Sequence, residues 1–272
     1  MSAQNDQTEK VTVRTLRQMK ERGDKIASMT AYDAAFAHAL ERAGIDFVLV
    51  GDSVGMVVQG QATTIPVTIE HMIYHSQMVA RGLRRAMLMV DMPFMSYASP
   101  QDCLRNAARL MKEGGAEIVK LEWGELEIDM VARLTACGVP VCAHLGLTPQ
   151  AIHKFGGYRV QGREEAAAKK MRDDARALEE AGADILLLEC VPIDLAAAIT
   201  AAATVPVIGI GAGPAVDGQI LVLYDVLDIF PGKRTRFSKN YMEQEGSIHG
   251  ALATFVDEVR SGAFPTEQYA FR

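Results

Sequence analysis

Short apolar runs, many of them rich in β-branched residues, alternate with longer segments of helical period along almost the whole chain. This alternation is typical of βαβ units wound around a parallel sheet. Strands are predicted at residues 26–30, 47–51, 86–91, 118–122, 139–144, 185–189 and 205–209, and a weaker pattern predicts an eighth at 220–224. Because eight parallel strands with helices between them close into a barrel, the sequence predicts an α/β fold of the (β/α)8, or TIM barrel, type.

The helical segments fit the same architecture. A helix predicted at residues 13–22 precedes the first strand and is expected to cover the bottom of the barrel. Within residues 164–182, one apolar stripe is formed by Ala167, Met171, Ala175 and Leu178. No linker interrupts the pattern, so residues 1–272 are expected to form one domain in which residues 1–10 are flexible.

The composition excludes several classes of protein. Of 272 residues, 49% are hydrophobic, and 34 acidic against 28 basic side chains give a formal net charge of −6. A disordered chain would be less hydrophobic, and the lack of a basic cluster argues against a nucleic-acid partner. No apolar run could cross a membrane and the polar start lacks a signal-peptide core, so we expect a cytosolic protein that acts on small molecules. Its four cysteines are expected to be buried thiols.

Several predicted strands end in a polar side chain, and these residues are Asp52, Asp91, Glu122, His144 and Glu189. In a (β/α)8 barrel the carboxyl ends of the strands converge on the face where active sites form. The four carboxylates carry −4 when ionised and Lys120 returns +1, which leaves −3 in a confined space. Like charges raise one another's pKa values, so the pattern favours a hard divalent cation such as Mg2+ or, alternatively, protonation of one or two carboxylates.

The side chains of Lys120 and Glu122 lie two residues apart on one predicted strand, so both are expected to point into the barrel. Lys120 can bind a substrate carboxylate as a cation or form a Schiff base after losing its proton. Its neighbour Glu122 favours the charged form and hence the first role. Glu189 instead follows an apolar run with no cation encoded beside it, so desolvation is expected to raise its pKa and make it the better proton acceptor.

Two further features at the strand ends allow more than one interpretation. His144 fits a pocket residue, a ligand contact or a core histidine, and contact with the site is preferred. The glycine-rich stretch 209–213 fits either a phosphate-binding loop or a tight turn. The turn is preferred because the dinucleotide fingerprint is not completed.

The order of motifs along the chain is more specific than any single motif. From the N-terminus they read VLVGDSVGMVVQG, DMPFMSY, KLEWG, PVCAHLGLTPQ, FGGYRVQGR, LLLECVP, PVIGIGAG and DGQILV. In this order, over roughly residues 11–264, they closely resemble the ketopantoate hydroxymethyltransferase family. One departure is Trp123, which follows Glu122 where many relatives have glycine, and residues 228–247 match less distinctly.

The resemblance implies an enzyme that transfers a hydroxymethyl group from 5,10-methylenetetrahydrofolate to 3-methyl-2-oxobutanoate, giving 2-dehydropantoate for pantothenate biosynthesis. By similarity, Mg2+ is held by Asp52 and Asp91 with Glu122 close to it, and the oxo acid contacts Asp52, Ser53, Asp91 and Lys120. Glu189 is then the general base that forms a Mg2+-stabilised enolate. A homo-oligomer, commonly a decamer, is implied as well.

Two other functions are compatible with an acidic barrel mouth. A metal-dependent lyase or mutase of the phosphoenolpyruvate type would work without folate. A noncatalytic barrel that binds oxo acids would hold Mg2+ and ligand but never exchange the C3 proton of the oxo acid.

Overall fold

Eight parallel strands form a closed barrel in the computed structural model, which describes residues 9–122, 125–229 and 234–272. In chain order they are β1 (Ile26–Thr30), β2 (Phe47–Val50), β3 (Met87–Asp91), β4 (Ile118–Glu122), β5 (Val141–Gly146), β6 (Ile185–Glu189), β7 (Val207–Ile210) and β8 (Gly218–Leu221). Each strand pairs with the next, and β8 pairs with β1 to close the ring. The predicted (β/α)8 fold is therefore confirmed.

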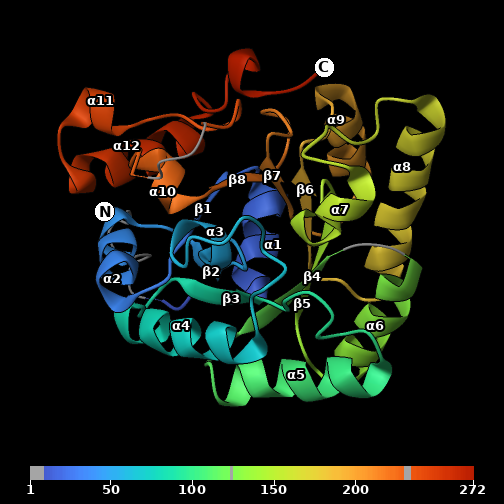
Figure 1. Ribbon diagram of the computed structural model, residues 1–272. Helices are drawn as coiled ribbons and strands as arrows, with labels where there is room; N and C mark the ends of the chain where they lie inside the picture. The colour runs from blue at the N-terminus through green and yellow to red at the C-terminus, as the bar shows by residue number, and fades with distance from the viewer. Residues whose placement is uncertain (1–8, 123–124, 230–233) are drawn as a thin grey trace.

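Helices surround the ring of strands in Figure 1, and the longer ones are α2 (Ala34–Ala43), α4 (Ile69–Gly82), α5 (Pro100–Lys112), α6 (Glu125–Ala136), α8 (Glu165–Glu180), α9 (Ile193–Ala202) and α12 (Ile248–Ser261). Short helices lie in the connections, namely α3 (Val54–Val57), α7 (Ile152–Phe155), α10 (Leu223–Val226) and α11 (Met242–Glu245), with 3-10 turns η1 (Pro149–Ala151) and η2 (Glu267–Tyr269). Among the described residues, no helix is long and apolar enough to span a membrane.

Helix α1 (Val13–Arg22) contacts the segments that lead into the strands, which form the amino-terminal face of the barrel. Arg17 pairs with Asp184 at 2.8 Å, directly before β6. Lys20 pairs with Asp217 at 2.6 Å, directly before β8. These contacts confirm that α1 covers the bottom of the barrel. Of the residues expected to be flexible, 1–8 lie outside the described part, and Lys10 donates a hydrogen bond to the carbonyl of Ala86 at 2.8 Å.

Three strands, β5, β7 and β8, have a boundary that differs from the prediction by two residues or more. Both β5 and β7 begin two residues later than predicted, after Pro140 and Pro206, because proline has no N–H to donate to the ladder. The weakly predicted strand at 220–224 was wrong at both ends, because β8 is Gly218–Leu221 and α10 starts at Leu223. A Cβ atom at Gly218 would lie 2.5 Å from the carbonyl oxygen of Ile26, so the close pairing of β8 with β1 requires a glycine.

Two burial predictions also need correction. In α8 the buried stripe consists of Ala168, Met171, Ala175 and Leu178, whereas Ala167 is exposed. The observed spacings of three, four and three residues follow one helix face more closely than the predicted set. All four cysteines are free thiols, but Cys137 is exposed after the end of α6 rather than buried.

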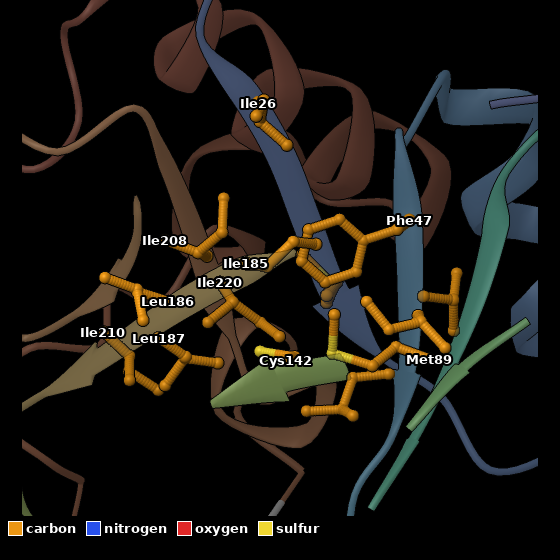
Figure 2. Packing of buried hydrophobic residues seen from close by; sticks show 14 of the residues in the cluster. Ile26, Phe47, Met89, Cys142, Ile185, Leu186, Leu187, Ile208, Ile210 and Ile220 are labelled. Atoms are coloured by element: carbon orange, nitrogen blue, oxygen red, sulfur yellow. The ribbon is translucent and has the colours of Figure 1, made fainter. Parts of the chain in front are cut away.

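The lower interior of the barrel is filled by apolar side chains. Figure 2 shows Phe47, Met89, Cys142 and Ile185, from four different strands, pointing into the same space. All four are at most 1% exposed. This apolar layer excludes water beneath the polar residues, which lie further along the same strands at their carboxyl ends.

Candidate active site

A cavity of about 560 Å³ opens at the carboxyl ends of the strands. The residues predicted as site residues all line it, namely Asp52, Ser53, Asp91, Lys120, Glu122, His144 and Glu189. The structure therefore brings together side chains from β3, β4, β5 and β6 and from the segment after β2. His144, for which several interpretations were open, is a cavity residue.

The floor of the cavity carries an acidic group formed by Asp52, Asp91 and Glu122. All three side chains are buried, and each offers a carboxylate oxygen within 4.8 Å of the others. The Nζ atom of Lys120 lies 2.5 Å from Oδ1 of Asp91 and 3.2 Å from Oε1 of Glu122. Because Asp91 and Lys120 are paired across β3 and β4, the register of these strands sets the contact.

Local backbone geometry also holds the acidic group together. The backbone N–H of Asp52 donates to Oδ2 of Asp91 at 3.0 Å. Gly51, directly before Asp52, is required by this close approach. A Cβ atom there would lie 2.9 Å from Oγ of Ser53 and 3.3 Å from Oδ2 of Asp91. The glycine at the end of β2 therefore allows the chain to pass tightly beside the carboxylate of Asp91.

Burial shifts the pKa of each of these groups, and the neighbouring charges either add to that shift or oppose it. Burial raises the pKa of Asp52 and of Asp91, and the carboxylate of Glu122 raises both further. Burial alone would lower the pKa of Lys120, but Asp91 and Glu122 outweigh it and hold the lysine charged. Burial would likewise raise the pKa of Glu122, but Lys120 and a hydrogen bond from His144 lower it to about 2. The site thus contains one firmly ionised carboxylate and two carboxylates that an added cation would help to ionise.

Glu189 is electrostatically different from Glu122. Burial, followed by the charge of Glu122, raises the pKa of Glu189 to about 8. The contrast expected from the apolar run before Glu189 and the lysine beside Glu122 is present in the structure. Burial and the charge of Lys120 lower the pKa of His144, so the imidazole is neutral at pH 7.

Two residues that hold the floor carboxylates or their partner, Gln150 and Tyr97, were not singled out from the sequence. The side-chain amide of Gln150, in η1, donates to Oδ2 of Asp52 at 2.8 Å and to the carbonyl of Met92 at 2.9 Å. The backbone N–H of Gln150 donates to Oε2 of Glu122 at 3.1 Å. The side-chain oxygen of Gln150, Oε1, accepts a hydrogen bond from the hydroxyl of Tyr97 at 2.6 Å. Gln150 ends the motif PVCAHLGLTPQ, which was the available signal, but no pattern linked it to Asp52.

The hydroxyl of Ser53 also has a partner that the sequence did not reveal. It lies 2.8 Å from the hydroxyl of Tyr32, which is buried and follows β1. Burial raises the pKa of Tyr32, so this phenol remains protonated and can donate to Ser53. Such a bond leaves the proton of Ser53 available to the cavity.

The glycine-rich stretch 209–213 begins with the last two residues of β7, and the chain bends at residues 211 and 212, in line with the preferred interpretation. Gly211 has a φ of +64°, and a Cβ atom there would lie 3.0 Å from both Phe237 and Phe271. Ile210 lines the cavity, whereas none of the glycines in the stretch does. The unusual Trp123 lies outside the described residues.

The donor set of the floor fits a hard divalent cation. Three carboxylates within reach of one another supply oxygen ligands, which Mg2+ and similar ions prefer. Their pKa values point the same way, because burial and the charge of Glu122 raise the pKa values of Asp52 and Asp91, and further positive charge would lower them again. Lys120 supplies part of that charge.

A parallel (β/α)8 barrel with titratable side chains gathered at the carboxyl ends of its strands is the architecture of an enzyme. A profile of the family described as ketopantoate hydroxymethyltransferase matches residues 10–267. The chain belongs to this family. It is 59% identical over 261 residues to the 3-methyl-2-oxobutanoate hydroxymethyltransferase of Alkalilimnicola ehrlichii, covering 96% of this chain and 94% of that protein. It is 53% identical to the protein of the same name from Nitrosococcus oceani, covering 96% and 99%.

Solved structures with the same fold are more distant in sequence. A phosphonopyruvate hydrolase in complex with oxalate and Mg2+ superposes with a TM-score of 0.62 at 16% identity, covering 94% of this chain and 92% of that one. An oxaloacetate acetylhydrolase superposes with a TM-score of 0.61 at 18% identity, covering 95% and 99%. At these identities the likeness concerns the fold alone, so it does not favour the alternative of a lyase or mutase over the family shown by the full-length match.

Proposed function

We propose that this chain transfers a hydroxymethyl group from 5,10-methylenetetrahydrofolate to 3-methyl-2-oxobutanoate, which yields 2-dehydropantoate and tetrahydrofolate. The observation that carries the proposal is the 59% identity to a 3-methyl-2-oxobutanoate hydroxymethyltransferase over nearly the full length of both chains. The buried acidic group with its lysine supports the same reaction.

Asp52, Asp91 and Glu122 are the residues that would hold Mg2+. When bound, the cation withdraws electron density from the carboxylate and ketone of the oxo acid and makes its C3 proton more acidic. Asp52 and Asp91 lie near enough to the cavity to contact the oxo acid as well. Gln150 fixes the carboxylate of Asp52 by donating to its Oδ2, and Asp52 held in this way would be oriented as a ligand of the cation.

Lys120 and Ser53 bind the oxo acid in this mechanism. Lys120 is charged and buried, so it offers an ammonium group to an anionic substrate where little water screens the attraction. The Ser53 hydroxyl, oriented by Tyr32, donates a further hydrogen bond. Together they orient the C3 proton of the oxo acid toward the carboxylate of Glu189.

Glu189 removes the C3 proton, and the proton stays on its carboxyl group. A carboxylate with a raised pKa is the better proton acceptor at neutral pH. The resulting carbon nucleophile attacks the methylene carbon of the folate, and the bond from this carbon to one of its two nitrogens breaks. Water then replaces the second nitrogen and supplies the oxygen of the new hydroxymethyl group. Tetrahydrofolate leaves with two new N–H protons, one from water and one that balances the C3 proton taken up by Glu189.

Incubation of the chain with oxo acid, methylenetetrahydrofolate and Mg2+ tests this function, with product formation followed by mass spectrometry. We expect 2-dehydropantoate to form and, without folate, the C3 proton of the oxo acid to exchange into D2O. Binding without any exchange would favour the noncatalytic barrel. Turnover of a substrate whose carbon–carbon bond is cleaved without folate would favour the lyase.

We also propose that the chain is a cytosolic homo-oligomer, with a decamer as the expected state. Exposed large apolar side chains support association, among them Tyr74 at 61% and Phe94 at 42% exposure. Light scattering on the purified chain should give a mass about ten times the protomer mass of 29.5 kDa. A mass equal to that of the protomer would contradict the assembly but not the reaction.

A further inference from the structure

The outer part of the cavity has the opposite charge to its floor. Three arginines line it, namely Arg159, Arg234 and Arg236, and all three side chains are exposed. Arg159 follows α7 beyond the end of β5, whereas Arg234 and Arg236 precede α11. Two segments far apart in the sequence therefore place cations at the mouth of one cavity.

The three arginines differ in their partners. Arg234 pairs with Asp228 at 2.6 Å and with Glu243 at 3.7 Å, so its charge is compensated. Arg236 donates to the backbone carbonyl of Gln268 at 3.3 Å and lies over a phenyl ring at 5.5 Å. Neither Arg236 nor Arg159 forms an ion pair within the described residues. These two side chains keep an uncompensated positive charge at the mouth.

One carboxylate in the outer cavity opposes them. Asp225 lines the same cavity, and burial raises its pKa to about 6, so it is mostly ionised at pH 7. Among the described residues, the two arginines without an ion pair carry two positive charges and Asp225 carries one negative charge. The mouth of the cavity is therefore positive. This sign is unusual for a chain whose formal net charge is −6 and whose cavity floor is rich in carboxylates.

The substrates of the proposed reaction explain why a positive mouth is useful. The oxo acid is an anion and is far smaller than a cavity of about 560 Å³. The reduced folate reacts at its pteridine end and carries two carboxylates on a glutamyl group at its far end. With the pteridine end at the cavity floor, the glutamyl group extends toward solvent, where Arg159 and Arg236 lie.

We propose that Arg159 and Arg236 form an anion subsite that binds the glutamyl carboxylates of the folate co-substrate. This inference rests on the proposed function. The planar guanidinium group matches a carboxylate with two parallel hydrogen bonds. Because both arginines are exposed, each contact contributes the modest energy of a surface ion pair, equivalent to a few-fold in affinity.

The test compares two ligands that differ only in charge. Tetrahydrofolate and its α,γ-diamide, in which both glutamyl carboxylates are carboxamides, are titrated into the full chain with oxo acid and Mg2+ present. The wild type is expected to bind tetrahydrofolate about tenfold more tightly than the diamide. In the Arg159→Gln/Arg236→Gln double variant this preference should vanish through weaker binding of tetrahydrofolate, with the diamide unaffected.

The control is the Arg133→Gln/Arg172→Gln double variant, which changes the net charge equally on the outer faces of α6 and α8. It should keep the preference of the wild type for tetrahydrofolate. Equal binding of the two ligands by the wild type, or an unchanged preference in the Arg159→Gln/Arg236→Gln variant, would overturn the subsite. The C3 proton exchange of the oxo acid, measured without folate, reports separately on the proposed function and should be equal in all three proteins.

Discussion

The Nε2 atom of His144 lies 3.4 Å from Oε2 of Glu189, with no hydrogen bond between them. On the other side of the ring, Nδ1 lies 3.2 Å from Oε1 of Glu122, a carboxylate that stays ionised. A neutral imidazole has one N–H, and the ionised Glu122 favours placing it on Nδ1. Nε2 then offers a lone pair toward Glu189, which can be used only when Glu189 carries a proton.

The first prediction concerns this lone pair. His144 is expected to stabilise the protonated form of Glu189, and hence the state reached after proton removal. Replacement of His144 by leucine should slow the C3 proton exchange of the oxo acid about tenfold to a hundredfold, which is less than the roughly 10²- to 10⁴-fold typical of the group that transfers the proton itself. The His144→Gln variant keeps a polar atom near the position of Nε2, so its exchange rate should fall by a smaller factor. Exchange at the wild-type rate in His144→Leu, followed by NMR in D2O, would remove His144 from the mechanism.

The second prediction separates the two glutamates. Glu189→Gln should still bind Mg2+ and oxo acid but lose C3 exchange by about 10²- to 10⁴-fold, because the group that accepts the proton is gone. Glu122→Gln should weaken metal-dependent binding and retain some exchange at saturating Mg2+. Both proteins are compared by calorimetry and by NMR in D2O. Wild-type exchange in Glu189→Gln would mean that another group is the base.

The third prediction links Glu189 to stability in the metal-free protein. The pKa of Glu189 is raised to about 8 in the folded state, from an ordinary value near 4.5. Between these pH values the unfolded chain has lost a proton that the folded chain keeps, so the free energy of unfolding falls as the pH rises through this window. Glu189→Gln removes this penalty and should melt a few degrees higher than the wild type at pH 8, with no difference at pH 4.

Thermal melts with a chelator present measure this effect. Glu180→Gln is the control, because Glu180 is an exposed glutamate at the end of α8. A constant difference between Glu189→Gln and wild type across the pH range would contradict a raised pKa at Glu189.

Some contacts of the site could be predicted from the sequence, whereas others depend on how the strands pair in the closed barrel. Lys120 and Glu122 could be placed together because side chains two residues apart share one face of a strand. Asp91, which lies nearer to Lys120 than Glu122 does, could not be named as its partner, because the register of β3 against β4 sets that contact. Gln150 is 98 residues from Asp52 in the chain and meets it only in the closed ring.

The fold itself was predictable because the pattern repeats eight times, and the errors lie where local chemistry interrupts it. Pro140 and Pro206 delay the start of two strands. At the weakest strand, Gly218 begins β8 because of its close approach to β1, a constraint that hydrophobic periodicity does not register. The missed partners Tyr32 and Tyr97 lie in loops, for which no periodic signal exists.

The fourth prediction concerns the charge state of Lys120. Because Asp91 and Glu122 hold its pKa above the ordinary value, Lys120 should act as a cation and form no Schiff base. Lys120→Ala should weaken oxo-acid binding at least tenfold, since it removes a buried charge. Borohydride treatment with oxo acid present should leave the mass of the wild-type protein unchanged. A stable adduct at Lys120 would instead show covalent catalysis.

The last prediction assigns metal affinity to Gln150, which contacts no substrate in the mechanism. Its amide donates to Oδ2 of Asp52 and to the carbonyl of Met92, and its Oε1 accepts from Tyr97, so the orientation of the amide is determined by its partners. Gln150→Leu removes the donor to Asp52 while keeping the backbone N–H that binds Glu122. Residues that orient metal ligands typically change metal affinity by about 10- to 100-fold, and we expect the Mg2+ dissociation constant to rise by that factor.

Calorimetric titration of Mg2+ in the presence of oxo acid measures this change, with Asp52→Asn as the reference for direct loss of a ligand. Tyr97→Phe should have a smaller effect than Gln150→Leu, because it frees Oε1 of Gln150 but leaves the amide donor on Asp52. If Gln150→Leu binds Mg2+ as tightly as the wild type while Asp52→Asn does not, the hydrogen bond from Gln150 is not needed to orient Asp52 as a metal ligand. Equal metal affinity in all of these proteins would instead remove Asp52 from the metal site, because the amide of Gln150 reaches the cation only through that carboxylate.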